Sequence, residues 1–404
     1  MNIEGEQMKK LYLIPLIFVL VAILIITACA APATPSPTSP PPTTTAVTTS
    51  PVSPPPTTSA PSPKPTTTAA KPAAPIKLKW AHLAPAQDLF NVEVFIPWTQ
   101  MIKERTTAIG KPVEITIYPA ETLVKGPDTY DAIITGVTQI GSNFGPQHFP
   151  GRMPLTEGLN LPLLFSTSAS AAMTAQELYD TRPEIQKELR EVKILAFHPP
   201  FPYQILSKNK YIKTLEDFKG VRSMVRGGTD SDAMRALGAT PVPVTMPETY
   251  ISLERGVIDM AALSWQGAWS FKWHEVTKYR TDLPVGLNTS LLTMGINLDV
   301  WNGLPADVQK IFTETTGAVF SKTAGQAQDK AQGKFAQMIK DYDAKAGNPE
   351  FYSLPNEEFL KWRQAVTPLY DKFAAERDAK GLAGKSILTD ILKLADKYNK
   401  EFPR

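Results

Sequence analysis

The chain has 404 residues, more than one hydrophobic core usually needs, so its length favours two globular domains with appended segments. A single Cys excludes a disulfide scaffold and a Cys-ligated zinc or iron–sulfur centre. A net charge of +3 is too small for a protein that binds nucleic acid through charge alone, and 38 Pro with 23 Gly do not fit collagen. The single Cys and many of the Pro lie near the N-terminus.

The first 28 residues have the pattern of a signal peptide. Lys9 and Lys10 form a short basic region, and residues 11–26 form an apolar run that is short for a spanning helix. The run ends in Ile-Thr-Ala-Cys at residues 26–29, which resembles the lipobox of bacterial lipoproteins. We therefore expect cleavage before Cys29 and a lipid on its thiol; the alternative is a buried Cys at the end of an uncleaved anchor. Translation starts at Met1 or at Met8.

Residues 29–75 consist almost wholly of Pro, Thr, Ser and Ala, with Lys64 and Lys71 as the only charged residues. Such a segment has too little apolar surface to form a core and favours polyproline II, so we interpret it as a tether. The alternative is a Pro-rich ligand for an aromatic groove.

Beyond the tether, strand and helix patterns alternate, which is typical of a mainly parallel α/β sheet. Residues 76–81 read as a strand, 89–102 as a helix with a kink at Pro97, 113–117 as a strand, 128–135 as a helix and 139–142 as a strand. Further strands are predicted at 193–197, 204–207, 220–226, 241–245, 257–265 and 290–298. Helices are predicted at 230–237, with Thr229 or Asp230 as N-cap, and at 248–255, 306–344, 356–379 and 386–402.

Three segments in a fixed order carry a family resemblance. They are Asp-Phe-Lys-Gly-Val-Arg at 217–222, Ala-Leu-Gly-Ala-Thr-Pro-Val-Pro at 236–243, and the pattern from Glu248 through Tyr250, Leu253 and Gly256 to Asp259. Together with Lys-Trp-Ala-His at 79–82 and Leu-Pro at 304–305, they resemble the extracytoplasmic solute receptors of tripartite ATP-independent periplasmic (TRAP) transporters. The resemblance runs from about residue 77 to beyond residue 312.

This resemblance implies an α/β fold of the periplasmic-binding-protein-like type II class, a two-lobed clamp with interleaved lobes and a helical C-terminal region. We expect lobe I to comprise residues 76–201 and 291–323, and lobe II residues 202–290 and 324–404. Such a receptor closes on one small organic solute between its lobes and delivers it to the membrane subunits of a TRAP permease. We expect a monomer that lies outside the cytoplasmic membrane, is held there through Cys29, and binds no cofactor, metal or nucleic acid.

The chain departs from the family at the positions that usually bind a carboxylate. The Arg expected four residues after Gly220 is replaced by Met224, and a second position that is often cationic falls at Tyr203. Either Arg226 supplies the missing charge, two residues further along the same strand face, or the solute is not a simple carboxylate. The sequence favours a larger or more apolar acid, or a neutral solute, over a small dicarboxylate.

Further solute contacts are expected where strands end. Trp265 follows the predicted strand at 257–265, and its alternative role is a core residue. Ser264 replaces an acid that metal-using relatives carry before this Trp, which argues against a metal. His82 is equally typical of a hydrogen-bonded structural histidine. The full set of predicted solute contacts is Arg226, Trp265, Met224, Tyr203, Asn143, Phe144, His82 and Met246.

No catalytic pattern is present in the sequence. The four His are scattered, and no Gly-x-Ser-x-Gly elbow, Walker loop or dinucleotide fingerprint occurs. We therefore expect no enzyme. A binding lipoprotein that senses a solute without transporting it is the main alternative, and a surface-tethered hydrolase is the weaker one.

Overall fold

The computed structural model describes residues 74–149 and 151–404. The predicted signal peptide, Cys29 and nearly all of the predicted tether lie outside these residues. Within them, no helix has both the length and the apolar character needed to cross a membrane.

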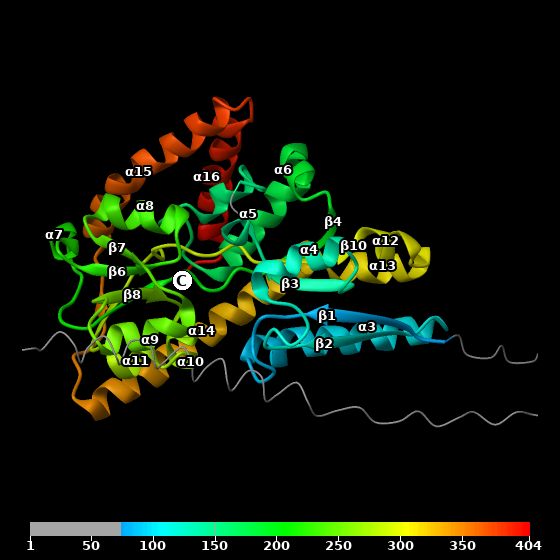
Figure 1. The fold of residues 1–404 in the computed structure, drawn as a ribbon, viewed down its shortest axis with the longest axis horizontal. Coiled ribbons are helices and arrows are strands. Elements are labelled where there is room, and N and C mark those ends of the chain that lie inside the picture. Colours follow the sequence, from blue (N-terminus) through cyan, green and yellow to red (C-terminus); the bar gives the residue numbers. More distant parts are fainter. Residues whose placement is uncertain (1–73, 150) are drawn as a thin grey trace, which may run out of the picture. The chain divides into compact units, whose positions relative to one another are not determined.

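The described part of the chain contains two mixed sheets, which helices cover (Figure 1). The first has the order β2-β1-β3-β10-β4, in which β1, β2, β3 and β4 run in one direction and β10 runs against them. Its strands are β1 (Ile76–Ala81), β2 (Val113–Tyr118), β3 (Ile140–Phe144), β4 (Val192–Phe197) and β10 (Thr293–Asn297). Because β10 comes late in the chain, the lobes are interleaved, as expected.

The second sheet has the order β11-β9-β5-β8-β6-β7, with β5 antiparallel to its neighbours β8 and β9. Its strands are β5 (Gln204–Ser207), β6 (Arg222–Val225), β7 (Thr240–Pro243), β8 (Met260–Leu263), β9 (Tyr279–Asp282) and β11 (Tyr352–Ser353). The chain passes between the sheets at residues 198–203 and again at residues 283–292. These two crossings bring polar side chains to the strand ends of both sheets.

Helices cover the sheets. The longer ones are α3 (Ile96–Ala108), α5 (Ser168–Thr181), α8 (Gly228–Leu237), α9 (Met246–Glu254), α13 (Ala306–Thr315), α14 (Ala318–Ala346), α15 (Asn356–Asp378) and α16 (Gly384–Glu401). The shorter ones are η1 (Asn91–Phe95), η2 (Gly126–Asp128), α4 (Thr129–Ile134), η3 (Pro146–His148), η4 (Thr156–Asn160), α6 (Pro183–Glu188), α7 (Leu215–Phe218), α10 (Trp265–Ser270), α11 (Trp273–Val276) and α12 (Leu298–Gly303).

One long helix was predicted over residues 306–344, and the structure shows two. Gly317 separates α13 from α14 with a positive φ of 60°, a conformation that favours Gly. Gly325 then allows a close approach, because a Cβ there would lie 2.4 Å from the Ala169 Cα of α5. Asp329 of α14 also accepts hydrogen bonds from the backbone N–H groups of Ser168 and Ala169, at 2.7 and 3.1 Å. These contacts fix α14 across the N-terminus of α5.

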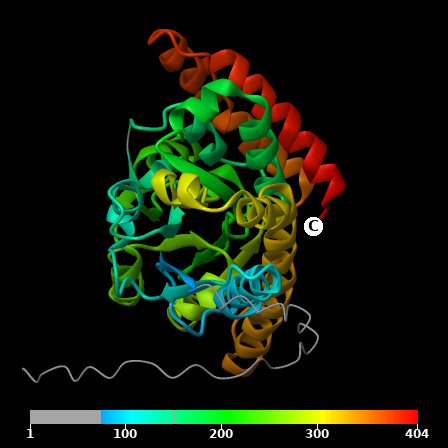
Figure 2. The ribbon, with the colours of Figure 1, turned by 90° about the vertical axis from the view of Figure 1, so that its right-hand side faces the viewer.

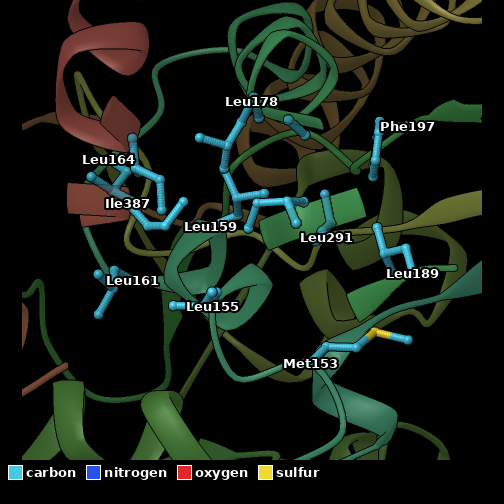
Figure 3. Close-up of a cluster of buried hydrophobic side chains, with 14 of the residues drawn as sticks. Met153, Leu155, Leu159, Leu161, Leu164, Leu178, Leu189, Phe197, Leu291 and Ile387 are labelled. Atoms are coloured by element: carbon cyan, nitrogen blue, oxygen red, sulfur yellow. The ribbon is translucent and has the colours of Figure 1, made fainter. Parts of the chain in front are cut away.

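The C-terminal helix does not pack where the sequence assigned it. Residues 324–404 were expected in lobe II, but α16 lies against α5 and against α15 (Figure 2). Ile387 and Ile391 of α16 are fully buried in the same cluster as Leu178 of α5 and Phe197 of β4, part of which is drawn in Figure 3. The apolar face of α16 therefore completes the core beside the first sheet.

Candidate functional site

The carboxyl ends of the strands carry polar side chains in both sheets. In the first sheet, His82 follows β1, Asn143 lies near the end of β3 and His198 follows β4. In the second sheet, Arg226 follows β6, and Tyr203 precedes the antiparallel strand β5 and so lies at the same edge. Ligands of open α/β sheets bind outside this edge, so these residues outline the candidate site.

Arg226 is the cation of the site, and its side chain is held in place by three polar partners. Its Nε donates to Asp230 Oδ2 at 2.8 Å, and its Nη1 donates to the Tyr203 hydroxyl at 2.9 Å and to Ser290 Oγ at 3.3 Å. The guanidinium lies over the Tyr203 ring, 4.6 Å from its centroid, a cation–π contact. The head group is therefore positioned before any solute binds.

The Nη2 atom of Arg226 makes no hydrogen bond to any residue that the structure describes. Its two N–H donors remain available on a side chain that is 26% exposed. A carboxylate oxygen is the acceptor that such donors suit best. Arg226 can thus bind an anion, which is the first of the two alternatives that the sequence left open.

The sequence predicted Thr229 or Asp230 as the N-cap of α8, but neither residue caps this helix. The N-cap is Gly227, and no side chain caps the helix. The Asp230 carboxylate instead bonds to Arg226 and accepts a hydrogen bond from Asn288 Nδ2. Its negative charge offsets part of the Arg226 charge.

Tyr203 and Met224 lie beside Arg226. The Tyr203 hydroxyl, 3.2 Å from Ser290 Oγ, holds the guanidinium where the family resemblance led us to expect a cation. Met224 lines a small hollow together with Arg226, Asp230 and Asn288. The site therefore joins one cation to an apolar wall.

His148 was not among the predicted contacts, although it belongs to the site. It ends η3, and the neighbouring Gln147 donates to the Leu291 carbonyl, next to the Ser290 that Arg226 contacts. Burial and the positive charge of Arg226 lower the pKa of the His148 imidazole. Its position four residues after the end of β3 was the only signal in the sequence.

Phe144 packs in a core beside the first sheet, and Trp265 packs in a core beside the second sheet. Phe144 is fully buried against Tyr130, with 5.3 Å between ring centroids. Trp265 is 1% exposed and packs on Phe351, 4.9 Å away. The site that the structure builds does not include these two residues, and for Trp265 the packing agrees with its alternative core role. Met246 is half-buried at the start of α9, beside the cluster that contains Trp265.

Asn143 has an unusual backbone. Its φ is +65°, in the left-handed region that few non-Gly residues adopt, although the residue belongs to β3. The residue is 9% exposed, and its side-chain amide makes no hydrogen bond within the described part of the chain. Such strained residues cluster at ligand sites, so its predicted solute contact stays a prediction with this support.

His82 and His198 are both buried and are 3% and 2% exposed. His82 Nδ1 lies 2.8 Å from Ser142 Oγ, the hydrogen bond of a structural histidine. In both residues, however, the Nε2 atom is buried and has no partner among the residues that the structure describes. Burial lowers the pKa of His82 to about 4 and that of His198 to about 3, so both rings are neutral at pH 7.

These two pKa values predict acid sensitivity. Unfolded imidazoles take up protons near pH 6.5, whereas the folded ones do so only near pH 4 and 3, so stability falls as the pH drops below about 6.5. Two such groups give a slope of up to about 2.7 kcal/mol per pH unit between pH 6 and 4.5. Urea unfolding measured at several pH values should show a slope that is about 1.4 kcal/mol per pH unit smaller in His198→Phe. An unchanged slope in that variant would contradict the burial of a neutral His198.

Asp88 and Gln266 connect the regions that follow β1 and β8. The Gln266 side-chain amide donates to Asp88 Oδ2 at 3.1 Å. Gln266 belongs to α10, directly after the second sheet's strand β8, and Asp88 lies between β1 and η1. The strand ends of the two sheets therefore meet here. Among the described residues, no group of three His, Cys, Asp or Glu side chains is placed to hold a metal ion.

The comparisons with known proteins agree with this geometry. Residues 80–377 match the family described as bacterial extracellular solute-binding protein, family 7 (DctP). The chain is 25% identical over 319 residues to the C4-dicarboxylate-binding periplasmic protein DctP of Rhodobacter capsulatus, covering 78% of this chain and 92% of that protein.

Two solved structures are also similar. A marine metagenome TRAP solute-binding protein specific for aromatic acid ligands, in complex with 3-hydroxybenzoate, is 26% identical with a TM-score of 0.73, covering 81% of this chain and 100% of that one. A TRAP solute-binding protein from Rhodoferax ferrireducens, with copurified benzoate, shares the fold at 24% identity with a TM-score of 0.71, covering 81% and 99%. The chain described here therefore belongs to family 7 of the bacterial extracellular solute-binding proteins and is a TRAP-type solute receptor.

Proposed function

We propose that this receptor binds a monocarboxylic acid with an apolar, aromatic-sized body and delivers it to the membrane subunits of a TRAP permease. The carboxylate lies on the Nη2 donors of Arg226, and the body lies against Met224. The single observation that carries the proposal is the Arg226 guanidinium, which three partners fix while two of its donors stay unused.

The charge of the site supports one carboxylate and not two. Among the described residues at this edge of the second sheet, Arg404 is paired with Asp282 at the end of β9, so Arg226 is the cation with donors to spare, and Asp230 already lies 2.8 Å from its Nε. A second carboxylate would find Met224 where the family resemblance places its usual cation, and would lose its hydration without an ion pair. A small dicarboxylate is therefore a poor fit.

Met224 supports an apolar body next to the carboxylate. Its side chain is polarizable and adapts to flat rings, and it lines the small hollow beside Arg226. Two relatives of the same fold hold benzoate and 3-hydroxybenzoate, each a ring with one carboxylate. The same chemistry suits the site of this chain.

Binding to a matched panel tests this function. In calorimetry with the purified full-length chain, benzoate should bind, and benzamide, which has the same ring without the charge, should bind at least about tenfold more weakly. Succinate, with two carboxylates and no apolar body, should also bind more weakly than benzoate. A preference for succinate or benzamide over benzoate would contradict the proposal.

We also propose that the receptor works as a lipid-anchored monomer without enzymatic activity. The sequence supports the anchor, because the apolar run ends in a lipobox-like Cys29 that is followed by a Pro-rich tether. In a bacterial host, the wild-type chain should fractionate with the membrane, and Cys29→Ser should abolish incorporation of radiolabelled palmitate. Equal labelling of both chains would exclude Cys29 as the attachment site.

A further inference from the structure

The buried imidazoles of His82 and His198, which follow strands β1 and β4 of the first sheet, each leave one ring nitrogen without a hydrogen bond among the described residues. The Nε2 atoms of His82 and His198 have no partner within the described chain, and both residues are at least 97% buried. Burying a polar atom without a hydrogen bond costs about 1–3 kcal/mol, so folded proteins keep few such atoms. Two of them in one cluster indicate that something else completes their hydrogen bonds.

The hydrogen bonds around His82 favour one of its two neutral tautomers. Trp80 Nε1, which can only donate, donates to Ser142 Oγ at 2.9 Å. The Ser142 hydroxyl makes one other side-chain contact, to His82 Nδ1 at 2.8 Å, and is free to donate its own hydrogen there. Nδ1 of His82 is then the acceptor, and its Nε2 carries the hydrogen of the neutral ring.

The opposite tautomer suits His198. Nε2 is its buried ring nitrogen without a partner among the described residues. With the hydrogen on Nδ1, Nε2 of the neutral ring is an acceptor, and this tautomer is part of the proposal below. One unpartnered donor and one unpartnered acceptor face the same cluster.

The two imidazoles lie close together at the candidate site. His82 and His198 pack edge to face on the Phe95 ring, with centroid distances of 5.1 and 5.3 Å, and His198 stacks on Phe90 at 5.6 Å. Phe90 lines a small hollow with Gln266, which belongs to the helix after β8 of the second sheet. The pair therefore lies near the place where the strand ends of both sheets meet.

We propose that His82 and His198 form a hydroxyl-binding subsite, in which the solute's hydroxyl oxygen accepts from His82 Nε2 and its hydrogen is donated to His198 Nε2. A hydroxyl group both donates and accepts, which matches one donor and one acceptor. A carboxylate only accepts and would leave His198 Nε2 without a partner. The proposal rests on the proposed function, since Arg226 binds the carboxylate, and it narrows the solute to a hydroxylated, apolar monocarboxylic acid.

Matched pairs of acids test the subsite. Calorimetry with the full-length chain compares 3-hydroxybenzoate and 4-hydroxybenzoate with benzoate, and mandelate with phenylacetate. We expect at least one of the hydroxylated acids to bind about tenfold or more tightly than its match without the hydroxyl. His82→Phe and His198→Phe should each reduce this ratio to near one. His274→Phe removes another buried imidazole, which stacks on Trp269 of α10, and should leave the ratio unchanged.

The outcomes separate the two proposals. If the acids without a hydroxyl bind through Arg226 but no hydroxylated acid gains affinity, or if the gain persists in both His variants, the subsite is excluded and the receptor function stands. If no acid binds, the proposed function fails and the subsite fails with it. The ratio is measured within each variant, so a change in its overall stability does not imitate the result.

Nitrogen NMR of the wild-type chain labelled with ¹⁵N-histidine gives a measurement that needs no substitution. We expect the Nε2–H tautomer for His82, the Nδ1–H tautomer for His198, and shifts of both Nε2 signals with the hydroxylated acid but not with its match. The same tautomer at both residues, or Nε2 signals that do not respond because a water molecule alone fills the position, would overturn the proposal.

Discussion

Replacing Arg226 by methionine is expected to weaken benzoate binding by roughly 30-fold to 5,000-fold, measured by calorimetry. Removing one partner of a hydrogen-bonded, desolvated ion pair costs about 2–5 kcal/mol. The loss falls on the carboxylate, because methionine keeps the apolar volume near Met224 and removes all five donors. Benzamide, which has no charge, should lose far less affinity in the same variant.

Two further variants make this expectation specific. Arg226→Lys keeps the charge but loses the planar fork, so its affinity should lie between those of the wild type and Arg226→Met. Arg235→Met removes an exposed arginine from α8, 62% exposed and paired with Asp232, and should leave binding unchanged. An equal loss in Arg235→Met, or no loss in Arg226→Met, would exclude Arg226 as the carboxylate anchor.

Much of the fold follows from local patterns in the sequence. Strands with a regular apolar pattern were placed within a few residues, and 76–81 and 204–207 match β1 and β5 without a shift. The predicted helix at 356–379 matches α15 to within one residue. These elements are bounded by Pro, Gly or polar residues, which act locally and are visible without the rest of the structure.

The misplaced elements depend on contacts that are distant in the sequence. Residues 168–181 form α5, which the sequence did not predict because its Ala- and Ser-rich face is buried by α14 and α16 and shows no strong amphipathic period. The predicted strand at 257–265 is shorter, because Ser264 caps α10 through its side chain and Trp265 begins the helix. The packing of α16 on α5 likewise depends on a partner more than 200 residues away.

The candidate site was only partly visible in the sequence for the same reason. Arg226 was found because it follows a strand and stands two residues after the position where the family's Arg was missing. Its partners Tyr203 and Ser290 lie on the two segments that cross between the sheets. Phe144 was expected at the site because it ends a strand, but strand alternation turns its side chain into the core while Asn143 has a left-handed backbone.

Replacing Asp343 by alanine is expected to lower the free energy of unfolding by about 3–5 kcal/mol, because it leaves Arg280 buried without its counter-ion. Arg280 is fully buried on β9, and its Nη2 donates to Asp343 Oδ1 of α14 at 3.0 Å. Burial lowers the pKa of Arg280 and raises that of Asp343, and the opposite charge of the partner counteracts the shift in each case. Each group therefore needs the other to remain ionised in the core. Urea unfolding at pH 7 measures the change.

A matched substitution on the surface separates this effect from that of any lost ion pair. Asp396→Ala removes an exposed i, i+4 partner of Lys400, 68% exposed, and should cost less than about 1 kcal/mol. The double variant Arg280→Met with Asp343→Leu should recover most of the loss, because no unpaired charge remains. If Asp343→Ala costs no more than Asp396→Ala, the pair does not hold α14 to the second sheet. A large loss that the double variant repairs would instead show that the instability comes from the buried, unpaired Arg280 charge, and that apolar side chains can replace the pair between β9 and α14.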